Sequence, residues 1–327
     1  MRTPRAGLLF ALVSAIGFGW SGPLAKALLD GGLDPLQTVW IRLAGGALVL
    51  LAVTVVLRPR ALLIPRHQIP AVAAYSLIGF AAVQAFYYSS VARLPVGIAV
   101  LLEYTSPILV VLWVRVVRRT RLPRTALAGP LVVLVGLTFV VGIWDGAGID
   151  PFGLLLGLGT AACAAAYFLL IPQAGDQIHP LGSLTWGLLG AVAALTPMAR
   201  PWALPWHVLG RDLQVGGRVL PAAVVCAGLV LVGTVLAYVT SIVAVRTLSA
   251  AVGATVASLE VLASIVVAWL LLGQSLTAVQ LAGAMIMLAG ALLAQSSLSR
   301  RPATAEEAAP PVGVETARSP AREPQPG

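Results

Sequence analysis

Apolar runs of about 20 residues recur along nearly the whole chain, with short polar segments between them. A helical run of that length spans the hydrocarbon core of a bilayer, and lipid forces a spanning backbone to make its hydrogen bonds internally. We therefore expect an all-α integral membrane protein with ten transmembrane helices, at residues 7–29, 36–57, 69–92, 96–117, 125–141, 152–171, 181–198, 220–245, 249–272 and 277–298.

The first five predicted helices resemble the second five. A shift of 156 residues superposes Val96-Gly97 on Val252-Gly253 and Trp113 on Trp269, together with the valines around them. Because five is odd, the second copy would enter the membrane in the opposite sense, and such inverted repeats are typical of transporters with a site between the copies. The expected organisation is one five-helix repeat at residues 7–141, a second at 152–298 and a disordered cytoplasmic tail at 299–327, which is rich in Pro, Ala, Glu and Arg.

Orientation follows from the arginines, because positively charged loops stay in the cytoplasm. The side that holds both termini would carry Arg2, Arg5, Arg58, Arg60, Arg66, Arg115, Arg118, Arg119, Arg121, Arg124, Arg246, Arg300 and Arg301. The opposite side would carry Arg93, Arg200, Arg211 and Arg218. Both termini are thus predicted to be cytoplasmic, with the second half less firmly oriented because its single long outer loop holds three of those four arginines.

Composition agrees with the membrane interpretation and narrows the partners. The chain is 59% hydrophobic and 10% charged, with mean hydropathy +0.94. Its net charge of +9 comes from residues between the apolar runs, without interleaved aromatics, so no nucleic-acid partner is expected. Cys163 and Cys226 lie inside apolar runs without metal-ligand spacing, so neither a metal nor a cofactor is expected. The absence of Asn and the strong preference for Arg over Lys indicate a bacterial source, hence a bacterial cytoplasmic membrane.

Several segments resemble a known family. They are residues 96–107, Val-Gly-Ile-Ala-Val-Leu-Leu-Glu-Tyr-Thr-Ser-Pro, then Ser258-Leu259-Glu260, then residues 269–273, Trp-Leu-Leu-Leu-Gly. The chain is similar to the EamA-type members of the drug/metabolite transporter superfamily, which have two tandem five-span domains. The resemblance covers about residues 7 to 298 and implies a central cavity among spans 1, 3, 4, 8 and 9. The chain departs from the family pattern at Val261, where a proline is usual, and at Gln274, where an acid is usual.

Four ionisable side chains lie within the predicted spans, where each must face protein or a wet cavity: Lys26, Arg42, Glu103 and Glu260. Lys26 is placed to extend its ammonium to the outer interface. Arg42 is either an interface anchor or a ligand for an anion or carboxylate. Glu103 and Glu260 are predicted to carry protons, as intramembrane acids do in pumps and transporters. The structural alternative is that Glu103 pairs with Arg42 and that Glu260 pairs with Arg246.

Other candidates are a proline and a set of aromatic residues. Pro107 cannot donate a hydrogen bond to the carbonyl of Glu103, so a hinge is predicted beside that acid. Aromatic residues with a polar tip are candidates for substrate binding, or else members of the interfacial aromatic belts. They are Trp20, Tyr87, Tyr88, Tyr104, Tyr238 and Trp269.

These residues favour a proton-coupled secondary transporter of a small metabolite, amino acid or drug-like solute, and the family resemblance implies that it is an exporter. A passive facilitator is the alternative, since one sequence does not establish coupling. A membrane-embedded transferase is disfavoured, because no Asp pair has metal-binding spacing. The expected partners are a small-molecule substrate, protons and the lipid bilayer, and the choice between a monomer and a homodimer stays open.

Overall fold

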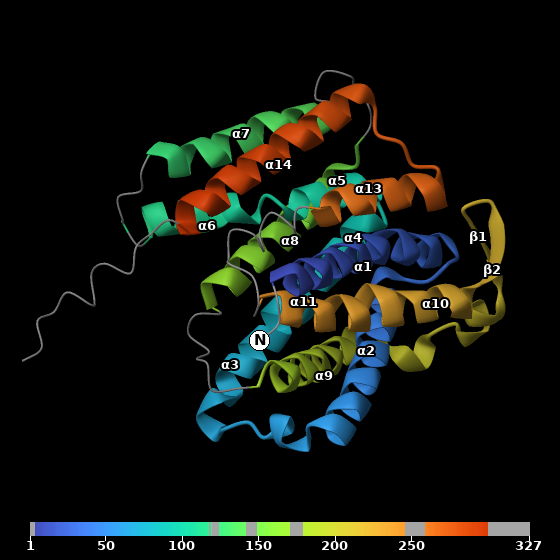
Figure 1. The fold of residues 1–327 in the computed structure, drawn as a ribbon. Helices are drawn as coiled ribbons and strands as arrows, with labels where there is room; N and C mark the ends of the chain where they lie inside the picture. The colour runs from blue at the N-terminus through green and yellow to red at the C-terminus, as the bar shows by residue number, and fades with distance from the viewer. Residues whose placement is uncertain are drawn as a thin grey trace, which may run out of the picture.

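The computed structural model describes residues 4–117, 119, 124–141, 149–170, 179–245 and 259–299. Helices dominate this part of the chain (Figure 1). They are α1 (Pro4–Asp30), α2 (Pro35–Leu57), α3 (Ile69–Ala74), α4 (Val83–Val91), α5 (Val96–Glu103), α6 (Ser106–Val116), α7 (Arg124–Val141), α8 (Pro151–Leu170), α9 (Pro180–Ala199), α10 (Ala222–Val230), α11 (Ala237–Val245), α13 (Leu259–Leu272) and α14 (Ala278–Ser299). Short 3₁₀ turns follow α2 and α9, at Pro59–Leu62, Arg66–Gln68, Pro201–Ala203 and Trp206–Gly210.

Among the described residues, two spans contain a π-helical segment. Segment η3 (Tyr75–Ala82) joins α3 to α4, and η7 (Leu231–Leu236) joins α10 to α11. Spans 3 and 8 are counterparts in the two halves, so the irregularity recurs at corresponding places. π-Helical turns often mark functional sites, because they redirect carbonyls and side chains that an α-helix would use internally.

The outer surface of the bundle suits lipid. Six helical stretches in the described residues are long and apolar enough to cross a bilayer, and four more are shorter apolar helices. Large apolar side chains such as Leu131 and Leu134 on α7 and Leu281 and Met285 on α14 face outward. The prediction that the membrane-spanning part of the protein is built from multiple helices is confirmed. Residues 246–258, which include the predicted start of span 9 and Arg246, lie outside the described residues, as does the predicted tail beyond Ser299.

A small β-hairpin departs from the all-helical prediction. Strands β1 (Asp212–Val215) and β2 (Arg218–Pro221) pair antiparallel around Gly216 and Gly217, whose φ angles are +60° and +72°. Such a two-residue turn needs positive φ at both positions, which glycine adopts freely. The predicted start of span 8 at Leu220 was therefore wrong, because Leu220 pairs with Leu213 in the hairpin and the helix begins at Ala222.

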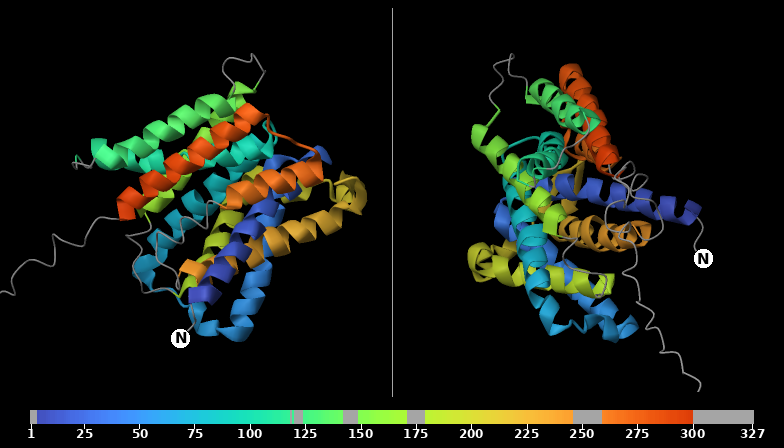
Figure 2. Two further views of the ribbon diagram at one scale, coloured as in Figure 1. Left: turned by 45° about the horizontal axis from the view of Figure 1, so that its top comes forward. Right: turned by 90° about the vertical axis from the view of Figure 1, so that its left-hand side faces the viewer.

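The two halves exchange their packing partners. Helix α1 packs against α11 and α13, and its counterpart α8 packs against α4, α5 and α6. Helix α2 pairs with its counterpart α9, and α7 pairs with α14 along one edge of the bundle (Figure 2). This exchange is what a two-fold relation between the halves produces. One contiguous core of buried side chains, including Leu43, Leu101 and Leu188, links both halves.

Candidate functional site

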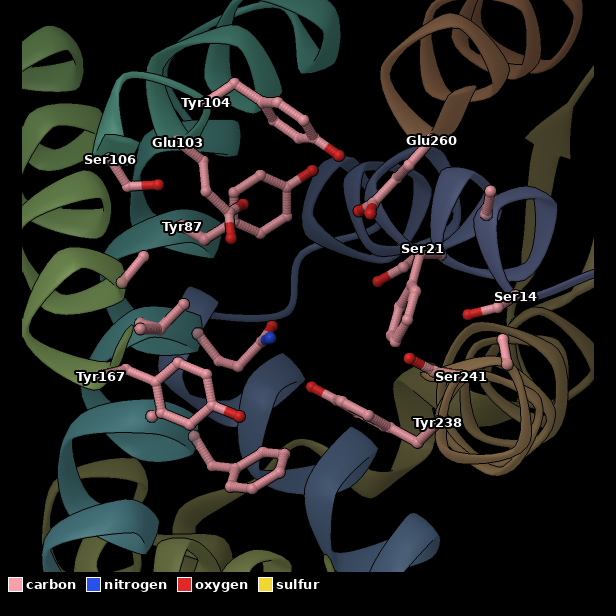
Figure 3. Close-up of a pocket in the computed structure, with 18 of the residues that line it drawn as sticks. Ser14, Ser21, Tyr87, Glu103, Tyr104, Ser106, Tyr167, Tyr238, Ser241 and Glu260 are labelled. Atoms are coloured by element: carbon pink, nitrogen blue, oxygen red, sulfur yellow. The ribbon is translucent and has the colours of Figure 1, made fainter. Parts of the chain in front are cut away.

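A cavity of about 400 Å³ lies between the two halves (Figure 3). Helices α1, α11 and α13 form one wall, and α4, the α5–α6 junction and α8 form the other. Arg42 of α2 and residues of η3 complete the lining. The polar side chains that line it are Ser14, Ser21, Arg42, Gln84, Tyr87, Glu103, Tyr104, Ser106, Tyr167, Tyr238, Ser241 and Glu260.

The structure brings the two predicted acids together in this cavity. Glu103 is the last residue of α5, and Glu260 lies in the first turn of α13. Both are half-buried, and their carboxyl groups point into the cavity from opposite walls (Figure 3). The hydroxyl of Tyr104 points toward the Glu260 carboxyl and interacts with it (Figure 3). One acid from each half therefore faces a shared space.

A break in span 4 positions Glu103. Helix α5 ends at Glu103, Tyr104 and Thr105 form a turn, and α6 begins at Ser106 with Pro107 in its first turn. The hydroxyl of Thr105 donates to the Leu102 carbonyl at 2.7 Å, which satisfies one of the carbonyls at the end of α5. Pro107 itself lines the cavity. The kink predicted at this proline is present as an interruption, and its use as a hinge stays a prediction.

Neither acid takes part in an ion pair among the described residues. The ion pairs there join Lys26 to Asp30 at 3.0 Å, and Arg93 to Asp150 at 2.8 Å. The alternative pairing of Glu103 with Arg42 is therefore not formed. The pairing of Glu260 with Arg246 is not tested, because Arg246 lies outside the described residues. Lys26 lies in the last turns of α1, as expected for a side chain that extends toward the interface.

Arg42 is buried at the wall of the cavity, with only 2% of its surface exposed. Its Nε donates to Thr234 Oγ1 at 2.8 Å and its Nη2 to the Gly233 carbonyl at 2.9 Å. Its Nη1 donates to Gln84 Oε1 at 2.6 Å and to the Tyr88 hydroxyl at 2.7 Å. An interface anchor would extend toward water, so this geometry does not fit that alternative.

The predicted aromatic residues divide between the cavity and other places. Tyr87, Tyr104 and Tyr238 line the cavity, whereas Tyr88 is fully buried behind it and bonds to Arg42 and Ser21. Trp20 packs against the core without lining the cavity. Trp269 is 58% exposed and borders a separate recess beside the β-hairpin. It lies about two and a half helical turns beyond Glu260, which places it on the opposite face of α13.

Sequence reasoning missed several lining residues. Gln84 lines the cavity and lies within an apolar span. A search for polar side chains inside apolar spans finds it, whereas a search for charged side chains alone does not. Tyr167 lies on α8, in span 6, which was not among the helices expected around the cavity. Ser14 and Ser241 carry no local signal. Among the described residues no group of three or more His, Cys, Asp or Glu side chains gathers that could hold a metal.

Within the described residues, the lining of the cavity extends toward one end of the bundle, and the two halves are in contact at the other end, which we call the sealed end. Ala11, near the start of α1, and Ala244, near the end of α11, both line it. At the opposite end Leu94 and Val96 are buried, and the Val96 N–H donates to Gln274 Oε1 at 3.0 Å across the two halves. Gln274 thus supplies an acceptor where the family pattern has an acid. The hairpin closes the same end, since the Gly216 N–H donates to the Leu271 carbonyl at 2.7 Å.

Known proteins resemble this chain over most of its length. The threonine/homoserine exporter RhtA of Escherichia coli is 30% identical over 296 residues, which cover 90% of each chain. The uncharacterized inner membrane transporter YicL of Salmonella typhimurium is 24% identical over 306 residues, which cover 92% of this chain and 99% of YicL. A solved crystal structure matches in fold with a TM-score of 0.58 and 18% identity, over 91% of this chain and 100% of the other.

The EamA-like transporter family matches the chain twice, at residues 5–142 and 151–295. These two matches cover both halves, and they confirm the predicted resemblance and the prediction of a transporter rather than an enzyme. The chain belongs to the EamA-like transporter family, with two tandem EamA domains in one multi-pass membrane protein.

Proposed function

We propose that this protein is a proton-coupled secondary exporter of a small metabolite, located in a bacterial cytoplasmic membrane with both termini in the cytoplasm. The observation that carries the proposal is the position of Glu103 and Glu260. One acid comes from each half, both face one cavity, and neither forms an ion pair within the described residues. A carboxyl group in such a place can take up a proton from one side and release it to the other as access changes.

Alternating access would come from one half rocking against the other. The proposed rigid units are the repeats at residues 7–141 and 152–298, with the cavity at their interface. The cavity extends toward the end where α1 begins, which is the cytoplasmic end in the proposed orientation. Movement to the opposite state would separate Arg93 from Asp150 and Val96 from Gln274, because each pair joins the two halves.

The relatives support the direction and the size of the solute. RhtA is named as an exporter of threonine and homoserine, and it aligns over 90% of this chain. A cavity of about 400 Å³ accommodates a solute of that size. We therefore take amino-acid-sized metabolites as the first solutes to test.

The test is transport in proteoliposomes containing the purified full chain, with L-threonine and L-homoserine as probes. Glu260→Gln keeps the shape of the side chain and fixes a neutral state. Exchange at equal pH should survive, whereas uphill transport driven by a pH gradient should fall to background. Glu103→Gln shows whether one acid or both are used. Asp212→Asn, which neutralises an exposed acid of the hairpin, is the matched control and should transport normally.

Normal gradient-driven transport in both single variants and in the double variant would reject proton coupling through these acids and favour the facilitator. Loss of folded protein in Glu260→Gln would instead indicate a structural ion pair, because neutralising one partner strands the other charge.

A further inference from the structure

Arg42 brings a positive charge to the cavity wall, and all of its hydrogen-bond acceptors are neutral. They are a threonine hydroxyl, a glutamine amide, a tyrosine hydroxyl and a backbone carbonyl. Within the described part of the chain no carboxylate pairs with it. Buried charges in proteins are normally paired, because the loss of hydration is costly unless an opposite charge compensates for it. Arg42 is therefore a buried cation whose acceptors among the described residues are all neutral.

One of the four acceptors can be replaced by a ligand. Thr234, Tyr88 and Gly233 are buried, whereas Gln84 is half-buried and lines the cavity. Gln84 Oε1 therefore lies between the Arg42 fork and the open space. A carboxylate entering from the cavity would exchange a neutral acceptor for a charged one, and guanidinium binds carboxylate in a fork-to-fork geometry that is stronger than a neutral hydrogen bond.

The π-helical segment η7 fixes the orientation of the guanidinium before any ligand arrives. Gly233 and Thr234 both belong to η7, and the Thr234 hydroxyl also donates to the Leu229 carbonyl at 3.0 Å, five residues earlier. On the other side, Tyr88 is held by Ser21 at 2.8 Å. A group held in advance loses less freedom on binding, so this support favours affinity for a small anion.

We infer that Arg42 is a carboxylate subsite, and that the transported solute carries a carboxylate that displaces the amide of Gln84. Glu103 and Glu260 face the same cavity and suit a cationic group on the same solute, so the cavity as a whole matches a zwitterion such as an amino acid. This inference rests on the proposed function in taking the cavity as the transport site. The competing account is that Arg42 only cross-links α2, α4 and η7.

The first experiment uses the unmodified full chain in lipid nanodiscs at one pH, without any gradient. Binding of each proteinogenic L-amino acid is compared with that of its amino alcohol, in which a hydroxymethyl group replaces the carboxylate. At least one amino acid should bind, and its amino alcohol should bind more weakly by about tenfold or more, because a hydrogen-bonded charge pair is lost. Equal binding within every pair, including the absence of binding, would overturn the inference.

The second experiment places a carboxylate at the subsite permanently. Gln84→Glu is nearly isosteric and gives Arg42 an internal partner, so the protein should fold while amino-acid binding weakens by about tenfold or more. Gln214→Glu makes the same chemical change on the exposed hairpin and should bind like the unmodified protein. Unchanged amino-acid binding in Gln84→Glu would show that Arg42 is a structural cross-link.

These results separate the inference from the proposed function. If binding depends on the carboxylate but a pH gradient drives no transport, the subsite stands and proton coupling falls. If a pH gradient drives export of amines that lack a carboxylate, proton coupling stands and the subsite falls.

Discussion

The two halves meet differently at the two ends of the bundle. At the sealed end Leu94 and Val96 are buried. Polar contacts also join the two halves there, such as the hydrogen bond from the Val96 N–H to Gln274. At the cavity end Tyr167 of α8 and Tyr238 of α11 come from opposite walls and point into the cavity (Figure 3). The polar contacts described at this seal are single hydrogen bonds and the ion pair of Arg93 with Asp150, which are individually weak. A transporter that must open this end in each cycle needs contacts of that kind.

One face of α8 shows the same contrast between close packing at one end and open space at the other. Gly157 and Ala164 are seven residues apart, which is about two helical turns, so they share a face. A side chain at Gly157 would contact Leu102 and would approach Ser90 Oγ to 3.1 Å. Ala164 faces the cavity instead. Helix α8 is therefore clamped against the first half around Gly157 and separated from its partners around Ala164.

The largest expected effect is a difference in thiol labelling between the two ends. In a background without Cys163 and Cys226, Ser241→Cys lines the cavity and Val96→Cys lies in the seal. A membrane-impermeant thiol reagent applied to inverted vesicles should label the first quickly. Labelling of Val96→Cys requires the sealed end to open. Even if that opening costs only about 1.4 kcal/mol, the labelling rate falls by about tenfold.

Right-side-out cells give the complementary measurement, in which neither position should be labelled quickly. Fast labelling of Val96→Cys from outside would show that the resting state is open at the other end. Labelling of Ser241→Cys from outside alone would reverse the proposed orientation of the termini.

A smaller effect is expected from substitutions on α8. Gly157→Ala adds a methyl group against Leu102, and overpacking of this kind costs about 1–3 kcal/mol, which exceeds the gain of about 1 kcal/mol in helix propensity. Its thermal midpoint in detergent should fall. Ala164→Val is the matched control on the same face, and it should change stability by about 0.5 kcal/mol or less, because the added carbons enter the cavity. A variant Gly157→Ala as stable as the parent would contradict the tight contact.

The spanning helices were predictable because lipid imposes one solution on an apolar run of sufficient length. The hairpin was missed because only runs of spanning length were considered, although Gly216-Gly217 between alternating residues is a strong hairpin pattern. The faces of the helices were less predictable. Tyr238 and Trp269 were both predicted to bind substrate because each is an aromatic residue with a polar tip inside a span. Tyr238 lines the cavity and Trp269 is exposed, because that pattern does not include the direction in which a residue faces around the helix axis.

The surroundings of Arg42 could not be predicted from local sequence. Its bond to Thr234 joins residues 192 positions apart, and it depends on a π-helical turn that no sequence pattern here announces. Arg42 itself was found, because a charge in an apolar span is conspicuous. What sequence reasoning left open was whether the charge faced water, a glutamate or neutral acceptors, and only the packing of both halves decides that.

The smallest expected effect concerns the ion pair at the seal, which lies outside the spanning segments. Arg93 donates to Asp150 at 2.8 Å, and the Phe152 N–H donates to the same carboxyl group at 2.9 Å. The bond from Arg93, followed by these backbone bonds, holds the pKa of Asp150 below its ordinary value. The ordinary pKa of Asp is about 3.9. Because the pKa of Asp150 is lower than that, its ionised carboxylate stabilises the seal fully at any pH above the ordinary pKa. This stabilisation is lost only when the pH falls through the lowered pKa. The labelling rate of Val96→Cys, divided at each pH by the rate for the same variant in denaturant, should therefore stay constant between about pH 5 and pH 8, because the division removes the pH dependence of thiol reactivity.

Neutralising the pair tests the same contact without acid. Asp150→Asn keeps the acceptor for the Phe152 N–H and removes the charge, so labelling of Val96→Cys should rise by about fivefold or less, as expected for an exposed pair. Arg93→Gln should give a similar rise, and the double variant should exceed neither single one, because both substitutions remove one interaction. Additive effects of the two substitutions would show that Arg93 acts through its stacking on the Phe152 ring, 4.8 Å from the ring centre, rather than through Asp150. The seal would then depend on an aromatic contact that pH does not change.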